Sequence, residues 1–311
     1  MTGDATTALP TLTLAVAYHG SRPHAAEGLA PYLPVCNVRP DGSRPAGFAH
    51  YDDEGGFPDR NELYSELSVQ RYLERHGTGD YLGLSHYRRL FVTRRFPRSY
   101  SPRTYDLTDW DWQDVQRYGA TDARLRTAVG GLDWCTAPPY DVRWAGHPDL
   151  LAQLEAHHPA RSLDALDAVV RNQHPSLPSV TDFLRSTRSM AFYNMFIARR
   201  RLALEYGAWL WPVLAECEAA LGRPTDLYER RWAGFLAERL HAFWLTNVLG
   251  PRGGRVGHLP IAVITAATSG AGSSVHRTAF GAQGLGARAV RLAPFGVRRL
   301  ANTALRLRGR G

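Results

Sequence analysis

The sequence predicts an α/β fold whose first half alternates strands with helices and whose second half is mostly helical. Residues 61–76 carry apolar side chains at helical spacing, and glycines follow them directly. Residues 80–91 then begin as an apolar run typical of a buried strand and break into His-Tyr-Arg-Arg. From residue 147 to residue 249 helical periodicity dominates. The succession of helix, tight turn and buried strand indicates this fold class.

Two short strands are predicted ahead of this unit. Thr11–Tyr18 is the first, and His19 follows at its carboxyl end. Leu33–Val38 is the second. The acidic segment His50–Gly56 comes next, and its aspartates and glycines suit a turn. A loop that contacts a sugar or a nucleotide is the alternative interpretation of this segment.

The helix of the central unit is predicted to run without interruption from Asn61 to His76. Asp59 or Asn61 is its candidate N-cap, and Glu66 lies near the positive end of its dipole. Gly77 ends the helix, so the strand begins at once.

The strand of the central unit opens into His86, Tyr87, Arg88 and Arg89, whose side chains can all donate hydrogen bonds. In α/β folds, ligands gather at the carboxyl ends of strands. The planar forks of arginine fit phosphate in bidentate fashion. The cluster therefore predicts a site for an anionic ligand. The alternative is a structural cluster in which the arginines pair with glutamates of the preceding helix.

A basic, proline-containing loop is predicted after this cluster, over residues 94–103, and it is a candidate lid. Asp133–Pro139 is predicted to be another strand. The helices predicted beyond it are one from His147 to Pro159, then Ser162–Arg171, Val180–Met190, Met195–Leu221 with a kink or break at Pro212, and Glu229–Leu249.

The positive charge of the chain is concentrated at its end. All 37 basic residues are arginine and 29 residues are acidic, so the formal net charge is +8. Residues 241–311 hold 10 arginines and no acidic residue, which leaves the rest at 27 − 29, or −2. Residues 289–307 place arginines and apolar side chains on two faces of a helix, a pattern that suits an anionic membrane surface. A solvated tail is the alternative, and we expect no nucleic-acid partner.

The three cysteines are far apart in the sequence, which argues against a disulfide framework and for a reducing compartment. The first residues lack the basic segment of a signal peptide, and no apolar run is long enough to span a bilayer. We therefore expect a cytoplasmic protein that is peripheral on the inner face of the plasma membrane if its tail binds lipid.

Three blocks of residues together resemble one known family. They are Asn61 and Glu66 with the run Asp80–Arg89, then Tyr193–Ile197 with Tyr206, Trp209 and Pro212, and last Gly234–Leu240. In this order, over about residues 12–248, the chain resembles the domain-of-unknown-function 4422 family, which occurs in capsular and exopolysaccharide glycosyltransferases. Gly20 departs from the lysine that this family usually has after the first strand.

The resemblance implies a GT-A-like, nucleotide-sugar-binding α/β domain with a helical C-terminal half. We expect a glycosyltransferase domain over residues 1–250, with its α/β part at about 1–145 and its helical part at about 146–250, and a basic tail over 251–311. The implied activity is transfer of a hexose from a nucleotide sugar, for which we favour a UDP-sugar. The acceptor would be a glycan, a lipid-linked sugar or a small molecule, in surface polysaccharide synthesis. The alternative is a noncatalytic nucleotide- or carbohydrate-binding protein with the same fold.

The resemblance also implies roles for individual residues. Glu238 and His86 are the candidate catalytic residues, with Glu238 as general base and Arg239 orienting it. A plain ion pair on a helix surface is the alternative for the Glu238–Arg239 pair. Asn194 is an acceptor- or sugar-binding candidate along with that pair, although a buried asparagine is often purely structural. The donor-binding candidates are His19, Asn61, Glu66, Asp80, His86, Tyr87, Arg88 and Arg89. For Asp80, which starts the strand, a structural role is the alternative to contact with the ribose.

Many GT-A enzymes use an Asp-x-Asp motif and Mn²⁺ or Mg²⁺ to stabilise the leaving diphosphate. The expected strand ends here in cationic residues instead, so we expect these to take part or all of the metal's role. The spacing exists once, at Asp109–Asp111, but it follows no apolar strand, and we favour a solvated acidic loop over a metal site there. We assign no metal ligand, and dependence on a divalent metal remains an alternative.

Overall fold

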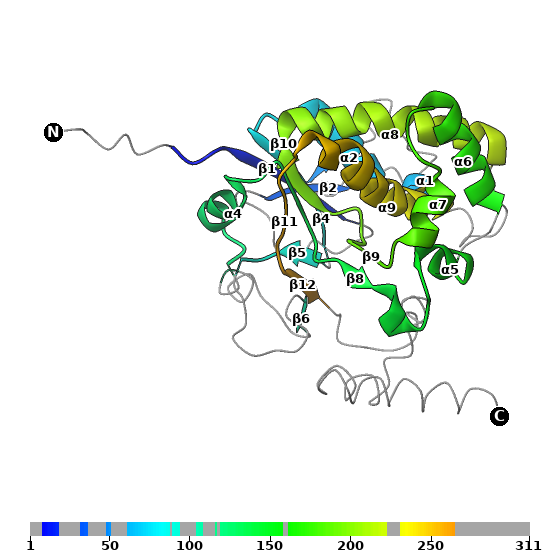
Figure 1. The fold of residues 1–311 in the computed structure, drawn as a ribbon. Coiled ribbons are helices and arrows are strands. Elements are labelled where there is room, and N and C mark those ends of the chain that lie inside the picture. Colours follow the sequence, from blue (N-terminus) through cyan, green and yellow to red (C-terminus); the bar gives the residue numbers. More distant parts are fainter. Residues whose placement is uncertain are drawn as a thin grey trace, which may run out of the picture.

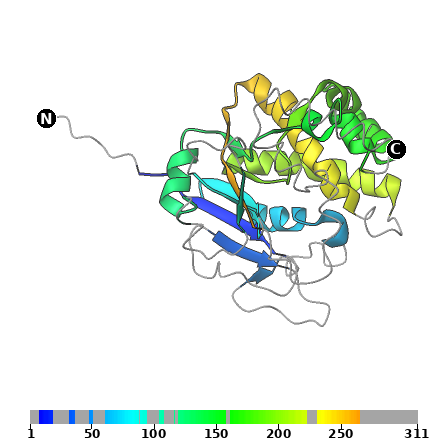
Figure 2. The same cartoon turned by 90° about the horizontal axis from the view of Figure 1, so that it is seen from below.

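The computed structural model describes residues 8–18, 32–36, 48–50, 61–87, 89–93, 104–107, 116, 119–157, 161–222 and 231–264 of the chain. These residues form a mixed β-sheet with helices packed against it, in agreement with the predicted α/β class (Figure 1). The long helices α8 and α9 lie together beside the sheet, while α4 lies at the opposite end from α5–α7 (Figures 1 and 2).

The main sheet runs in the order β11-β7-β10-β4-β1-β2-β3, with β5, β12 and β6 attached to it beyond β4. β1, β2, β3 and β4 are parallel, whereas β10 is antiparallel to both of its neighbours. The strands are β1 (Leu12–Ala17), β2 (Tyr32–Cys36), β3 (Ala49–His50), β4 (Tyr81–His86), β5 (Arg89–Phe91), β6 (Thr104–Leu107), β7 (Trp134–Thr136), β10 (Phe196–Arg199), β11 (Val256–His258) and β12 (Ile261–Ile264). A separate pair joins β8 (Tyr140–Asp141) to β9 (Ser189–Met190).

The helices agree with most of the predicted helical segments. They are α1 (Asn61–Tyr64), α2 (Leu67–His76), α4 (Asp122–Val129), α5 (Leu150–Glu155), α6 (Arg161–Gln173), α7 (Val180–Ser186), α8 (Arg200–Leu221) and α9 (Trp232–Trp244), with the shorter turns η3 (Val142–Ala145), η5 (Leu245–Leu249) and η6 (Gly250–Arg252). Pro212 lies inside α8, and the helix continues through it rather than ending there.

β4 is the strand on which the candidate site is built. It pairs with β1 in parallel, so that Ala17 lies opposite His86, and with β10 in antiparallel fashion, so that Leu84 lies opposite Phe196. Alternate side chains point to opposite faces of a strand, and both faces of β4 are buried. A strand buried on both faces is expected to be apolar along its length, and this is the pattern from which it was predicted.

The sequence interpretation missed β10. Met195–Leu221 was expected to be helical, but Phe196–Arg199 is a strand and the helix begins only at Arg200. A short apolar run has no periodicity that separates a buried strand from a buried helix. Here the open edges of β4 and β7 decide, because they supply hydrogen-bond partners to both sides of the run.

The predicted helix over residues 61–76 is also interrupted. Ser65 has a left-handed backbone (φ 48°), which ends α1 and restarts the chain as α2 with Glu66 at its N-cap position. Gly234 of α9 faces this break, since a Cβ at Gly234 would lie 3.8 Å from the Ser65 side chain. The break and the glycine together bring α9 close to Glu66.

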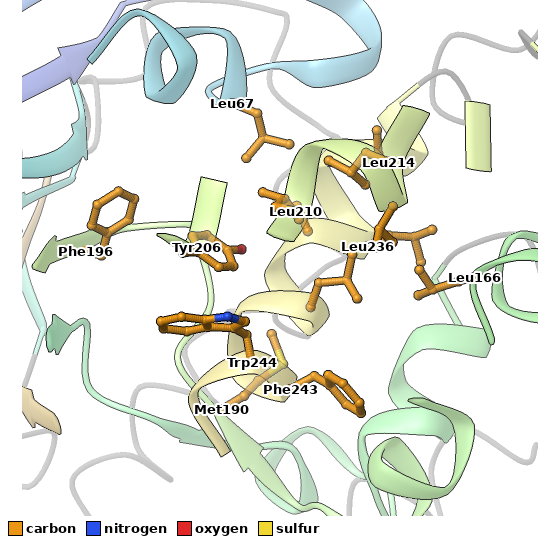
Figure 3. Packing of buried hydrophobic residues seen from close by; sticks show 14 of the residues in the cluster. Leu67, Leu166, Met190, Phe196, Tyr206, Leu210, Leu214, Leu236, Phe243 and Trp244 are labelled. Carbon is orange, nitrogen blue, oxygen red and sulfur yellow. The ribbon is translucent and has the colours of Figure 1, made fainter. Parts of the chain in front are cut away.

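A hydrophobic core joins α2, α8 and α9 to one face of the sheet. Figure 3 shows Tyr206, Leu210 and Leu214 of α8 packed with Leu236, Phe243 and Trp244 of α9. Within this core the Trp134 indole donates a hydrogen bond to Nε2 of His241, at 2.9 Å. Burial lowers the pKa of His241 to about 3, so its ring stays neutral and can accept that bond. The core thereby fixes α9 relative to β7.

The sheet extends past the expected end of the main domain. β11 and β12 pair with β7 and β5, so residues 256–264 belong to the sheet although the sequence placed them in the tail. Residues 265–311, including the amphipathic segment 289–307, lie outside the described residues. Within the residues that are described, no helix is both long and apolar enough to cross a membrane.

Candidate functional site

The sheet brings two of the three sequence blocks to the same edge. Because β10 runs antiparallel to β4, the residues before Phe196 lie alongside the residues after Leu84. The turn that precedes β10 therefore meets the carboxyl end of β4. Beside it, the backbone N–H of Tyr87 donates to the Ala17 carbonyl, and the Tyr87 ring stacks on Tyr18 at 5.8 Å between centroids. Tyr18 and Tyr87 thus lie together at the carboxyl ends of β1 and β4.

The turn before β10 is conformationally strained. Tyr193 (φ 86°) and Asn194 (φ 51°) both have left-handed backbones, an arrangement that costs about 1–3 kcal/mol per non-glycine residue. The conformation is held by polar contacts from another helix, because the Tyr193 N–H donates to Oε1 of Glu238 at 2.9 Å. Strain of this kind that neighbouring groups hold in place is typical of functional sites.

Asn194 connects the three sequence blocks. Its Nδ2 donates to Oε1 of Glu66 at 2.8 Å and to the carbonyl of Gly234 at 3.0 Å. The residue is 3% exposed, and within the described part of the chain its Oδ1 has no hydrogen-bond partner. The Asn194 side chain therefore holds the start of α2 and the start of α9 close together. Its Oδ1 is a buried hydrogen-bond acceptor that no described residue uses.

His86 lies on the other side of Glu66. Its Nε2 is 3.9 Å from Oε1 of Glu66, and the two side chains keep 14% and 13% of their surface exposed. The break at Ser65 places the Glu66 carboxylate between Asn194 and His86. Asn194 and His86 thus both lie near the same oxygen of the Glu66 carboxylate.

Glu238 is the most strongly held carboxylate of the site. Its Oε1 accepts from the Tyr193 N–H, and its Oε2 accepts from Arg239 Nη1 at 2.8 Å. Burial raises the pKa of Glu238, and the neighbouring Glu66 carboxylate raises it further. Arg239, the Tyr193 N–H and Arg89 act in the opposite direction. The side chain keeps 14% of its surface exposed.

Arg239 is buried beneath this carboxylate. Only 1% of its side chain is exposed, and its guanidinium donates to Glu238, to the Phe235 carbonyl and to Oε1 of Gln153. Its Cζ also lies 5.4 Å from the centre of the Phe192 ring. A buried cation needs such partners, and these fix its position. The pair is therefore not the ion pair on a helix surface that the sequence allowed as an alternative.

Arg89 completes the described cationic part of the site. Its Cζ lies 4.1 Å from the centre of the Tyr193 ring, a cation–π arrangement. Its Nε is buried, and no described residue accepts a hydrogen bond from it. The guanidinium thus lies beside the strained turn, and its Nε–H has no acceptor among the described residues.

The structure brings together six of the predicted site residues. They are Glu66, His86, Arg89, Asn194, Glu238 and Arg239. Tyr87 lies next to them against Tyr18. His19 and Arg88 lie outside the described residues, as does the side chain of Asn61.

Asp80 is not brought to this cluster. It precedes β4 at the opposite end of the strand, six residues and about 20 Å from His86 at 3.3 Å per residue. There its Oδ2 accepts from the backbone N–H and the hydroxyl of Thr11, each at 2.8 Å. These hydrogen bonds lower the pKa of Asp80 and tie the start of β1 to β4. We therefore assign Asp80 a structural role instead of the expected donor-binding role.

Two contributors to the site carry no signal in the sequence. Gln153 of α5 looks like any helix residue, yet its Oε1 accepts from the buried Arg239. Tyr193 acts through its backbone N–H as well as its ring, and the motif indicates neither contact. Only the packing of α5 and α9 against the turn reveals them.

The described residues include no group of three or more His, Cys, Asp or Glu side chains arranged to hold a metal ion. Asp109–Asp111 lies outside those residues, so a divalent metal at that pair is neither supported nor contradicted by the structure. We derive no step through a metal.

Comparison with known proteins places this geometry in context. The apo structure of the WbbM bifunctional glycosyltransferase superimposes with a TM-score of 0.73 at 19% sequence identity, over 85% of this chain and 48% of that chain. The chain thus spans about half the length of that protein, and the likeness shows a GT-A-like fold. No curated protein sequence matches the chain. The model of a domain of unknown function, DUF4422, matches residues 14–248, which contain all three sequence blocks. The chain therefore belongs to the DUF4422 family.

Proposed function

We propose that the protein is a glycosyltransferase that moves a hexose from a nucleotide sugar, a UDP-sugar in the first instance, to a glycan, lipid-linked or small-molecule acceptor. The observation that carries this proposal is the Glu238 carboxylate at the carboxyl end of β4. It has a raised pKa, a buried cationic partner and a partly exposed side chain. The GT-A-like fold supports the same class of reaction.

In the proposed reaction, an acceptor hydroxyl attacks the anomeric carbon of the donor while Glu238 takes up the hydroxyl proton. The bond from the anomeric carbon to the diphosphate oxygen breaks, and the nucleoside diphosphate leaves with the electron pair. A base with a raised pKa is better matched to this work near neutral pH than an ordinary carboxylate. Arg239 and the Tyr193 N–H hold the carboxylate in one orientation.

Arg89 is the described residue placed to stabilise the leaving diphosphate. The negative charge on that group increases as the bond breaks, and a guanidinium whose Nε has no hydrogen-bond acceptor among the described residues is suited to stabilise it. We propose that Arg88, its neighbour in sequence, acts with it. His86 and Asn194 both lie near the Glu66 carboxylate beside this part of the site.

Nucleotide binding gives the first test. We would titrate UDP, GDP, dTDP and CMP into the full chain by calorimetry, with and without Mn²⁺, and repeat the titrations with Arg89→Ala. We expect saturable binding of one nucleotide and at least a tenfold weaker Kd in the variant. Arg201→Ala serves as a matched control, because Arg201 lies exposed on α8. Equal affinity in wild type and Arg89→Ala would contradict the donor-site assignment.

Turnover gives the second test. We expect Glu238→Gln to lower nucleotide release in the presence of acceptor by about 10²–10⁴-fold, the usual contribution of general-base catalysis. Nucleotide affinity should be preserved. Glu205→Gln, which alters a half-exposed carboxylate on α8, should keep full activity. Nucleotide binding without turnover of any sugar donor would instead support the noncatalytic alternative.

A further inference from the structure

An exposed tryptophan follows β7, which runs in the same direction as β4 because both strands are antiparallel to β10. Trp144, on the turn η3, is 51% exposed, whereas most large apolar side chains of the described residues are buried. Its ring is 5.7 Å from that of Tyr140, at 88°. Tyr140 in turn lies 6.3 Å from Phe192. We call Tyr140, Trp144 and Phe192 the aromatic platform; Trp144 is its exposed end and Phe192 its buried end.

The local structure holds Trp144 in place. Asp141 caps η3 by accepting from the Arg143 N–H, and it forms a bidentate ion pair with the Arg143 guanidinium at 3.0 Å and 2.6 Å. Gly146 ends the turn with a left-handed backbone (φ 92°). A tryptophan on a capped turn loses little further entropy when it binds a ligand.

The aromatic platform is continuous with the Glu238–Arg239 pair. β8 and β9 pair Tyr140 with Met190, which ties η3 to the segment that leads into the strained turn (Figure 1). Phe192 immediately precedes Tyr193, whose N–H binds Glu238, and the Phe192 ring contacts Arg239. A chain of four contacts, through Tyr140, Phe192 and Arg239, therefore links the exposed tryptophan to the proposed general base.

We propose that the aromatic platform is an acceptor subsite that binds one pyranose ring of an oligosaccharide, while another ring of the same oligosaccharide presents its hydroxyl to Glu238. This inference rests on the proposed function and extends it by naming an acceptor of at least two sugar rings. It selects an oligosaccharide over a lone sugar or an unrelated small molecule.

The chemistry of the platform fits a pyranose. A pyranose ring has a face of C–H groups, which packs on an aromatic ring, and a rim of hydroxyl groups, which need hydrogen-bond partners. Trp144 supplies the aromatic surface. Asp141 and Arg143 place an acceptor and a donor next to it, and the Arg143 side chain is 58% exposed. A lipid or a hydrophobic peptide would not use this charged pair.

The test measures glycan binding separately from activity. The probes are gluco-, galacto- and manno-configured tetrasaccharides and the corresponding monosaccharides, detected by saturation-transfer NMR and titration of the full chain. We compare wild type with Trp144→Ala, Trp144→Phe and Val256→Ala, the last being an exposed apolar residue on β11. We expect one tetrasaccharide to bind more tightly than its monosaccharide. Trp144→Ala should weaken tetrasaccharide affinity at least tenfold. Trp144→Phe should retain most of that affinity, and Val256→Ala should leave it unchanged.

The outcomes separate this inference from the proposed function. If tetrasaccharide binding depends on Trp144 but no nucleotide binds, the platform stands and the glycosyltransferase proposal falls. If nucleotide sugars turn over but Trp144→Ala leaves glycan affinity and the acceptor KM unchanged, the platform falls and the function stands. Failure of every tetrasaccharide to bind wild type overturns the platform as well.

Discussion

Glu74 on α2 provides a quantitative test of the packing between the helices. Its Oε1 accepts from Gln70 Nε2 at 2.9 Å, and its Oε2 accepts from Trp211 Nε1 of α8 at 2.7 Å. Burial raises the pKa of Glu74 from 4.5 to about 7, more than its hydrogen bonds and the nearby Arg71 and Arg75 lower it. The carboxyl is therefore predicted to be largely protonated in the folded protein below neutral pH.

This pKa determines the sign and size of a pH effect on stability. Between pH 4.5 and pH 7 the folded state retains a proton that the unfolded state releases, so stability falls as pH rises. A change from 4.5 to about 7 corresponds to about 3 kcal/mol in the free energy of unfolding. Glu74→Gln removes this dependence. Its amide can accept from Trp211 and donate to a flipped Gln70, so both hydrogen bonds can be kept.

Urea unfolding of wild type and Glu74→Gln at pH 4.5, 6 and 8 measures the effect. Relative to wild type, the variant should become about 3 kcal/mol more stable as the pH rises from 4.5 to 8. The comparison between the two proteins cancels the titration of all other groups. Glu205→Gln, a more exposed carboxylate on α8, should follow the wild-type pH dependence. Parallel curves for wild type and Glu74→Gln would refute the reasoning.

Three further predictions concern single positions. Asn194→Ala removes both hydrogen bonds of the amide and puts alanine in a left-handed backbone. It should lower the free energy of unfolding in urea by about 2–4 kcal/mol and lower kcat at least tenfold. An unchanged kcat would contradict the role of Asn194 in orienting Glu66. Gly207→Ala should cost about 1–3 kcal/mol, because a Cβ there meets the Glu74 carboxyl carbon at 2.5 Å; unchanged thermal stability would count against the close packing of α2 on α8. Asp80→Asn should leave nucleotide affinity unchanged, since Asp80 binds Thr11 away from the site, and a tenfold loss by calorimetry would return it to the donor site.

The strained turn gives the site its architecture. Tyr193 and Asn194 adopt backbone conformations that cost energy, and the groups that compensate come from α2 and α9. Each of these contacts orients a carboxylate, Glu66 in one case and Glu238 in the other. The same hydrogen bonds therefore stabilise the turn and position the proposed chemistry.

Short apolar runs explain where sequence reasoning failed locally. The sequence pattern of Phe196–Arg199 predicts the start of a helix, and only pairing with β4 and β7 makes it a strand. The break at Ser65 is equally invisible, because a serine with a left-handed backbone carries no periodic signal. Both features depend on contacts with residues far away in the sequence.

The sequence by itself determined the α/β class, the buried strand β4 and the polar cluster at its carboxyl end. Hydrophobic periodicity and local turn residues act over a few positions and need no distant partner. Only the tertiary structure decided that Asn194 joins Glu66 to α9, that Arg239 is buried beneath Glu238 and that Asp80 lies away from them. Those relations follow from the antiparallel register of β10 and the packing of α9. Strand register and helix packing are set by long-range pairing, which a local pattern does not encode.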